Sequence, residues 1–295
     1  MRETHVARGW LRPWLLLTPT LLLLAAFFAV PFAWLVRLSL YERASGPAGF
    51  YLPETLTLAN YGQILTDRYF GAVAGATLRL GLLVTAAAVL LAYPLAAYIW
   101  SAGPRLKQAV ILGVLLPKLT NLLVAMYGVL VLLSAAGPIN GALLGLGIIG
   151  APLPMFANLF AVVAGETLII LPYPVLIIAT ALHGVNPELY SAARGLGASA
   201  PRAFFEVPFK LTLPSTILAT LVTLIWALGA FTAPVILGNP ELYPVSVEVF
   251  TQTFEDVNWP TGAALAVLNS GAVLLLVLLT YALQRRVALS TGQHA

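Results

Sequence analysis

Long apolar runs separated by short polar segments dominate the hydropathy pattern of this chain. Charge-free runs cover Leu15–Val36, Leu80–Trp100, Leu211–Leu237 and Thr261–Leu283. Each is long enough to cross a roughly 30 Å hydrocarbon layer, which takes about 20 residues as an α-helix. We expect the first run to be a retained span, because a signal peptide has a shorter apolar region and a small-residue cleavage site. The pattern therefore predicts transmembrane helices.

The middle of the chain is harder to divide, since no charged residue lies between Leu119 and Gly165. Within this stretch, Gly137–Pro154 is dense in glycine and proline, the two residues that break helices. We therefore predict one span on each side of this segment. The result is an all-α integral membrane protein, a single domain over residues 1–295. The six predicted spans lie at about residues 15–36, 77–100, 109–136, 155–182, 211–237 and 261–283.

Composition supports a membrane protein, because 60% of the residues are apolar and 9% are charged. A chain of 295 residues with this composition cannot hide its apolar surface in one soluble core. The basic residues lie mainly in segments that are cytosolic if the N-terminus is cytosolic. These are Arg2, Arg8, Arg12, Arg105, Lys107, Arg194, Arg202, Lys210, Arg285 and Arg286. The other segments hold only Arg37, Arg43 and Arg68, so the positive-inside rule predicts cytoplasmic N- and C-termini. The net charge of +4 follows from this asymmetry, and we expect no nucleic-acid partner.

Residues that carry enzymatic chemistry are scarce. Cysteine is absent, which excludes disulfides, thiolate nucleophiles and Cys-ligated metals. The three histidines, His5, His183 and His294, are scattered and predict no metal site. No phosphate-binding loop is found, so any ATP must be bound by another chain. We expect no catalytic residue, metal or cofactor in this chain.

One polar segment, Asn186–Lys210, separates two apolar runs. Asn186 is suited to cap a helix, Pro187 to its first turn, and Gly197 to end it in a left-handed conformation. Ser199 is suited to cap a second short helix. Two readings remain open from the residues alone: a docking loop for another protein, or an interfacial loop on lipid headgroups. Leu189, Ala192, Ala193 and Leu196 recur at helical spacing and form a narrow face of small residues, which is compatible with either reading.

This segment resembles a known motif. SAARGLGAS at Ser191–Ser199, followed by VPFKLTLP at Val207–Pro214, is similar to the EAA loop in permease subunits of binding-protein-dependent ABC importers. In that family the loop forms coupling helices that insert into a groove of the ATPase. The signature glutamate falls on Ser191 and the aspartate of the close subfamily falls on Gly195. The resemblance implies that ATPase coupling involves Glu188, Ser191, Ala192, Ala193, Gly197 and Arg202.

Further segments resemble spermidine/putrescine-type permeases in the correct order. Ala230–Pro240 and Asn258–Leu268 are similar to the fifth and sixth spans of those permeases. Leu56–Leu65 is similar to the entry of their second span, and Thr77–Ile99 to that span itself. One departure is in the third span, where the family often has an arginine a few residues past a Leu-Pro pair. Ala125 occupies that place here, whereas Lys118 directly follows the Leu-Pro pair.

The resemblance implies a six-transmembrane-helix fold of the type I ABC importer permeases in a bacterial inner membrane. It implies a second homologous permease, two ATPase subunits and an extracytoplasmic solute-binding protein as partners, besides the lipid bilayer. The expected cargo is a small polar solute, first a polyamine, with an aminophosphonate, a ferric complex or another organic ion as alternatives. A stand-alone secondary transporter would show inverted repeats, and an intramembrane enzyme would need a nucleophile or metal set. We find neither.

Ionisable residues inside the membrane are functional candidates because their burial is costly. Lys118 lies about 14 Å from the cytosolic end of the third predicted span, and Glu166 about 16 Å from the outer end of the fourth. Both are thus near the midplane, where they either pair, face the substrate or, for Lys118, extend to the interface. Trp226, Phe231 and Pro234 of the fifth span are candidates to line the same path. Small-residue spacing also predicts close helix packing at Gly71, Gly75, Gly141 and Gly145.

Overall fold

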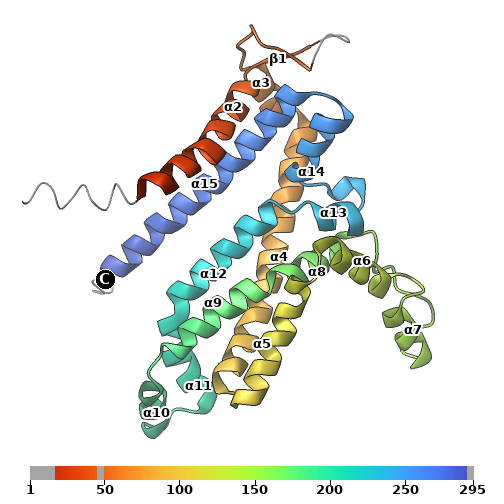
Figure 1. Ribbon diagram of the computed structural model, residues 1–295. Helices are drawn as coiled ribbons and strands as arrows, with labels where there is room; N and C mark the ends of the chain where they lie inside the picture. Colours follow the sequence, from red (N-terminus) through yellow and green to blue (C-terminus); the bar gives the residue numbers. More distant parts are fainter. Residues whose placement is uncertain (1–16, 45–49, 291–295) are drawn as a thin grey trace, which may run out of the picture. The chain divides into compact units, whose positions relative to one another are not determined.

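The computed structural model describes residues 17–44 and 50–290, which are almost entirely helical (Figure 1). Several basic residues of the orientation argument and two histidines lie outside the described residues: Arg2, Arg8, Arg12, His5 and His294. The side chains of Arg285 and Arg286 are likewise not described. The chain divides into two compact units. Unit 1 comprises the described residues up to Asp67 together with Val249–Asn269, and unit 2 comprises Arg68–Glu248 and the described residues from Ser270.

Unit 1 begins with an apolar helix and continues through a small hairpin. Its elements are η1 (Ala25–Ala29), α2 (Val30–Leu38), β1 (Glu42–Arg43), β2 (Tyr51–Leu52), α3 (Ala59–Thr66), η4 (Thr251–Glu255) and the start of α15 (Trp259–Ser290). Strands β1 and β2 pair antiparallel. The buried Asn60 side chain donates to the carbonyls of Ser39 and Tyr41 at 2.9 and 2.8 Å, which satisfies the backbone where α2 ends. Trp259 stacks on Phe50 with ring centroids 4.6 Å apart.

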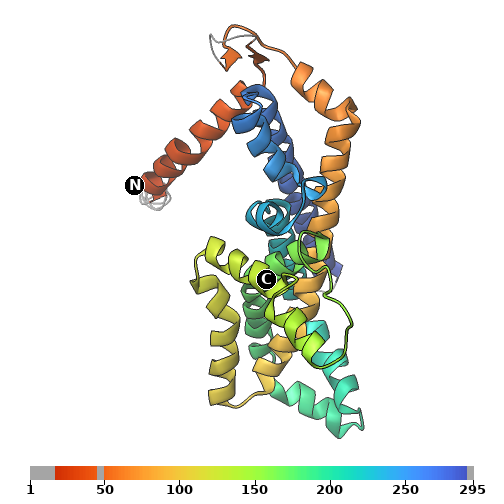
Figure 2. The same cartoon turned by 90° about the vertical axis from the view of Figure 1, so that its right-hand side faces the viewer.

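Unit 2 is built around the long helix α4 (Arg68–Ser101), on which α8, α9 and α12 pack. The elements that follow α4 are α5 (Pro104–Leu119), α6 (Leu122–Leu133), α7 (Pro138–Gly145), α8 (Leu159–Ile170), α9 (Pro172–His183), α10 (Pro187–Gly195), α11 (Ala200–Phe204), η2 (Phe205–Phe209), α12 (Lys210–Leu228), α13 (Thr232–Leu237), η3 (Pro240–Leu242) and α14 (Val245–Phe250). The last two residues of α14 belong to unit 1. After a short connection, α5 turns back along the end of α4 (Figure 2).

Small residues on α4 make this packing close. Ala88, Ala92 and Ala96 follow one another at single-turn spacing and are fully buried. Lipid tails are as apolar as leucine, so helices in a membrane associate through close packing rather than through release of water. The alanines let α9 and α12 approach α4, where Ile178 of α9 and Ala219 of α12 join the same buried cluster.

Helix breaks divide three of the predicted spans. Pro172 begins α9 directly after α8, and the two helices are bent by 46°, because proline lacks the N–H of the ladder and clashes with the preceding turn. The predicted third span is two helices, since Thr120 is extended and the Asn121 side chain caps α6 through Leu123 N at 2.9 Å. The predicted fifth span ends early, because α12 stops at Leu228 before Gly229 and α13 begins at Thr232.

By length and composition, the described residues contain five helices able to cross a membrane, or six if the bent pair α8 and α9 is one span. The five are Leu17–Leu38, Arg68–Ser101, Leu122–Gly145, Ala200–Leu228 and Trp259–Ala282. The all-α membrane fold expected from the sequence is therefore confirmed.

Close backbone approach occurs at other glycines than those predicted. A Cβ atom at Gly71, Gly75, Gly141 or Gly145 would meet open space. A Cβ on Gly165 would instead lie 2.5 Å from a Leu237 side-chain carbon, so this glycine lets α13 pack directly on α8. The predicted close packing at the four glycines is therefore not observed among the described residues, because no neighbouring atom lies within 4 Å of a Cβ built at any of them.

Candidate functional site

The polar segment predicted for coupling, residues 186–210, forms two short helices at one end of unit 2 (Figure 1). The Asn186 side chain accepts a hydrogen bond from Glu188 N at 2.9 Å, which confirms the predicted cap of α10. Gly197 has φ +90, the left-handed conformation predicted for the end of that helix. Ser199 precedes α11 as its cap residue, but its side chain makes no capping hydrogen bond. We call residues 186–210 the coupling segment.

Most of the predicted coupling residues are exposed. Glu188, Ser191, Ala192, Gly197 and Arg202 lie on the surface, and Ala193 is half-buried. The apolar face of α10 is open as well, because Leu189 is 48% exposed and Leu196, at the tip, is 90% exposed. A leucine this exposed gains nothing from folding of this chain alone, so the face is available for a partner.

The second coupling helix is not separate from the next apolar helix. α11, η2 and α12 run as one helix of 29 residues, Ala200–Leu228. A π-helical turn at Phe205–Phe209 absorbs Pro208, which is how a helix commonly accommodates such an interruption. The predicted coupling loop covers residues 186–210, and in the structure its last residue, Lys210, is the first residue of α12.

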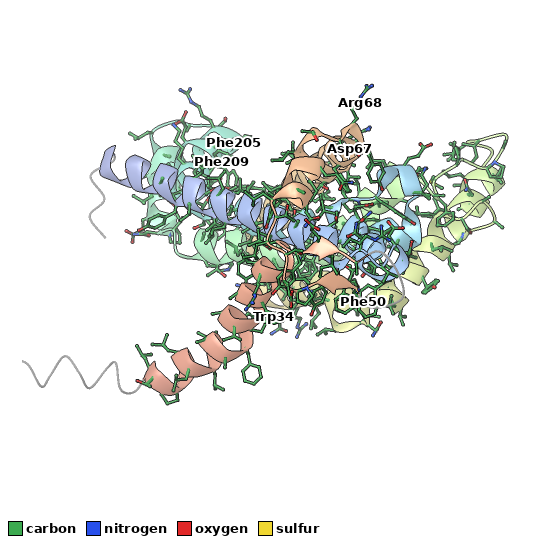
Figure 3. The ribbon with its side chains drawn as sticks, turned by 90° about the horizontal axis from the view of Figure 1, so that it is seen from above. Trp34, Phe50, Asp67, Arg68, Phe205 and Phe209 are labelled. Carbon is green, nitrogen blue, oxygen red and sulfur yellow. The ribbon has the colours of Figure 1, made fainter. Side chains whose placement is uncertain are left out.

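Aromatic side chains hold the coupling segment against α4. Tyr93 of α4 lies 6.1 Å from Phe204 and 5.1 Å from Phe209 between ring centroids, and Trp100 lies 5.9 Å from Tyr190. Phe205 and Phe209, labelled in Figure 3, are 5.5 Å apart. These aromatic residues are not among the predicted site residues. Their signal in the sequence is the pair of phenylalanines at Phe204 and Phe205 inside an otherwise polar segment.

A second group of predicted residues meets between α5, α8, α9 and α12. The Lys118 ammonium lies 4.3 Å from the ring centroid of Trp226 and 5.1 Å from that of Tyr173. The two rings are 6.1 Å apart at an interplanar angle of 33°. Both distances to the ammonium are within the about 6 Å range of a cation–π interaction. We call Lys118, Glu166, Tyr173 and Trp226 the cation cluster.

Glu166 contacts the other edge of the same indole. Trp226 Nε1 donates to Glu166 Oε2 at 3.3 Å, and the backbone N–H of Ala233 donates to the same carboxyl group. Glu166 is only 6% exposed. Lys118 and Glu166 form no ion pair, whereas Lys210 and Glu206 lie within ion-pair distance of one another. Direct pairing of Lys118 with Glu166 is therefore not observed, and Trp226 contacts both.

Phe231 and Pro234 lie just beyond this cluster. Phe231 precedes α13 and is 37% exposed, whereas Pro234 is buried within α13. Both follow the break after α12 and flank Ala233 of α13, whose backbone N–H donates to the Glu166 carboxyl group. Pro234 is buried and presents no open surface, so it shapes the site rather than lining it.

Tyr173 is the member of the cluster that sequence reasoning missed. It lies between Pro172 and Pro174, directly after the break that separates α8 from α9. An aromatic residue next to a helix break at membrane depth was the available signal. Among the described residues, no group of three or more His, Asp or Glu side chains is placed to hold a metal ion.

Comparisons with known proteins concern the chain as a whole. The family described as binding-protein-dependent transport system inner membrane component matches residues 110–290. The spermidine/putrescine transport system permease protein PotB of Haemophilus influenzae is 30% identical over 230 residues, covering 78% of this chain and 79% of its own length. PotB of Escherichia coli is 29% identical over 231 residues, covering 78% and 83%.

Solved structures of other importers share the fold. A bacterial alginate ABC transporter in complex with an alginate pentasaccharide-bound periplasmic protein contains a chain that matches with a TM-score of 0.79, 18% identity and coverage of 96% of each chain. The inward-facing MetNI methionine ABC transporter matches with a TM-score of 0.58 and 16% identity, covering 73% of this chain and 94% of that chain. At these identities the likeness concerns the fold.

Proposed function

This chain belongs to the binding-protein-dependent transport system inner membrane components and is a permease subunit of an ABC importer, and we propose that it carries a polyamine across the inner membrane. Two PotB proteins, named for spermidine and putrescine, support the substrate class at 30% and 29% identity. The observation that carries the proposal is the cation cluster, in which two aromatic rings hold an ammonium and a buried carboxyl group accepts a hydrogen bond from one of those rings.

A polyamine is a flexible chain of ammonium groups, and it must lose water to pass a membrane-embedded path. Burying an unpaired charge costs several kcal/mol, so the path must supply counter-charge or aromatic faces. Trp226 and Tyr173 supply faces, and Glu166 supplies a carboxyl group at the same place. Phe231, partly exposed beyond the cluster, extends this aromatic lining, and Pro234 shapes it.

The coupling segment is proposed to receive the motion of the ATPases. Its exposed Leu189 and Leu196 would enter an apolar groove of the partner, with Glu188, Ser191, Ala192, Ala193, Gly197 and Arg202 around them. The helix Ala200–Leu228 carries Arg202 near one end and Trp226 near the other, roughly 36 Å apart at 1.5 Å per residue. A displacement of the coupling segment would thus reach the cation cluster through one continuous helix.

The remaining assembly follows from this role. We propose that the chain pairs with a second homologous permease, rests on two ATPase subunits that bind the ATP, and receives substrate from an extracytoplasmic binding protein. It would bind no ATP, metal or cofactor itself. The distribution of basic residues supports cytoplasmic N- and C-termini, with the coupling segment on the cytoplasmic side.

Reconstitution of the whole complex in proteoliposomes tests the proposal. We expect saturable, ATP-dependent uptake of radiolabelled spermidine or putrescine when the binding protein is present. Uptake of neither polyamine, together with transport of an anionic or zwitterionic solute, would contradict the proposed substrate. In that case Lys118 would be the natural contact for the solute's negative group.

A further inference from the structure

Lys118 occupies the position that an organic cation would take. Its ammonium lies over Trp226 at 4.3 Å and near Tyr173 at 5.1 Å. Aromatic faces recognise an alkylammonium ligand with this same geometry. The lysine stem is a four-carbon chain that ends in an ammonium, which makes it chemically close to one end of a diamine.

The placement of Lys118 leaves its side chain free to move away. It is the penultimate residue of α5, and the backbone becomes extended at Thr120. Its ammonium contacts two aromatic rings, and no ion pair joins it to Glu166. A cation held by rings is displaced more readily than one held in a buried ion pair, because its departure leaves no contacting carboxylate without a partner.

We propose that Lys118 is a tethered competitor: its ammonium fills the aromatic pair of Tyr173 and Trp226 while the path is empty, and a substrate ammonium binds there by displacing it. This inference rests on the proposed function, because it requires a cationic substrate. Glu166 accepts the N–H of the same indole and is expected to keep this hydrogen bond during the exchange.

Competition of this kind lowers the affinity of the site for every cation. The apparent affinity of a ligand is its intrinsic affinity multiplied by the fraction of sites that are free to bind it. A lysine that fills about nine tenths of the sites lowers the affinity of a cation about tenfold. The factor is the same for every cation, so a diamine is preferred over a monovalent cation only through its second contact, with Glu166.

The test is a putrescine titration of the complete permease–ATPase complex in nanodiscs, read by tryptophan fluorescence. For each protein, the fluorescence of the matching variant that also carries Trp226→Phe is subtracted, so that the remaining signal comes from the Trp226 indole. Lys118→Met should lower the half-saturating putrescine concentration about tenfold. The matched control is Lys107→Met, which removes a lysine near the start of the same helix, α5. The Lys107 side chain contacts His183 of α9, and its loss should leave the half-saturating putrescine concentration unchanged.

Half-saturation that is unchanged or raised in Lys118→Met would overturn the proposal. If that variant fails to fold, Lys118→Arg decides, because a guanidinium stacks on aromatic faces and competes at least as well as an ammonium. The half-saturating putrescine concentration of Lys118→Arg should then equal or exceed that of the unmodified complex, and a lower value would contradict the proposal. The titration is independent of transport, so a tighter Lys118→Met site without polyamine uptake would refute only the proposed substrate.

Discussion

The coupling segment and the cation cluster differ in how their residues are brought together. The coupling segment is contiguous in sequence, and its caps and end are local features at Asn186 and Gly197. The cation cluster draws its side chains from α5, α8, α9 and α12, and the breaks after Leu119 and before Pro172 help to set their positions. A surface that another protein reads can be encoded in one short segment, whereas a site that holds a solute requires several helices to meet.

The two regions are nevertheless joined by one element. The helix Ala200–Leu228 starts in the coupling segment and carries Trp226. The aromatic cluster around Tyr93 and Phe204 ties the start of this helix to α4. Motion at the surface and geometry at the cluster are therefore expected to be linked, and substitutions in either region separate the two roles.

The largest effect is expected at the tip of the coupling segment. Leu196→Asp should reduce uptake and substrate-stimulated ATPase activity about a hundredfold, because a charge at the centre of an apolar interface costs as much as the loss of a hot-spot residue. Since Leu196 is 90% exposed, the thermal unfolding of the isolated chain should not change. Leu196→Met, which keeps the apolar surface, serves as the control and should retain uptake. Normal uptake by Leu196→Asp would remove the coupling role from α10.

An intermediate effect is expected in the cation cluster. Trp226→Leu removes the ring under Lys118 and the N–H donor to Glu166, so the uptake efficiency should fall about tenfold to thirtyfold. The measurement is the initial rate of uptake against substrate concentration in proteoliposomes. Trp34→Leu on α2 removes an indole that also lies near a cation, Arg37 at 5.6 Å, but outside the cluster. Equal losses in both variants would show that the effect is not specific to the cluster.

The smallest effect concerns the two caps of the coupling segment. Asn186→Ala should destabilise α10 by about 1 kcal/mol, because the side chain caps Glu188 N at 2.9 Å. Ser199→Ala should cost close to nothing, since the Ser199 side chain makes no capping hydrogen bond. Amide hydrogen exchange in α10 and α11 measures both. Equal losses of protection in the two helices would contradict the difference between the caps.

Much of the fold follows from the sequence, because lipid imposes a simple rule on apolar segments. Charge-free runs of sufficient length predict helices, and the ends at Ser101, Trp259 and Ala282 lie close to the predicted spans 77–100 and 261–283. The start of α4 at Arg68 lies well before the predicted start at 77. Asn186, Pro187 and Gly197 likewise predict α10, since capping and left-handed backbone depend on neighbouring residues alone. These features need no knowledge of the other helices.

Only the tertiary structure decided what those helices bring together. The sequence leaves open whether Lys118 and Glu166 pair, face the substrate or, for Lys118, extend to the interface, because the depth of a residue does not specify the direction in which its side chain points. The structure shows no ion pair between them. Trp226 lies between the two groups because α12 packs on α4 and α9, and Tyr173 reaches Lys118 because Pro172 bends the chain there. Gly165 admits α13 against α8, which no spacing pattern indicated. Contacts between distant segments depend on packing angles and breaks, and hydrophobic periodicity carries no information about either.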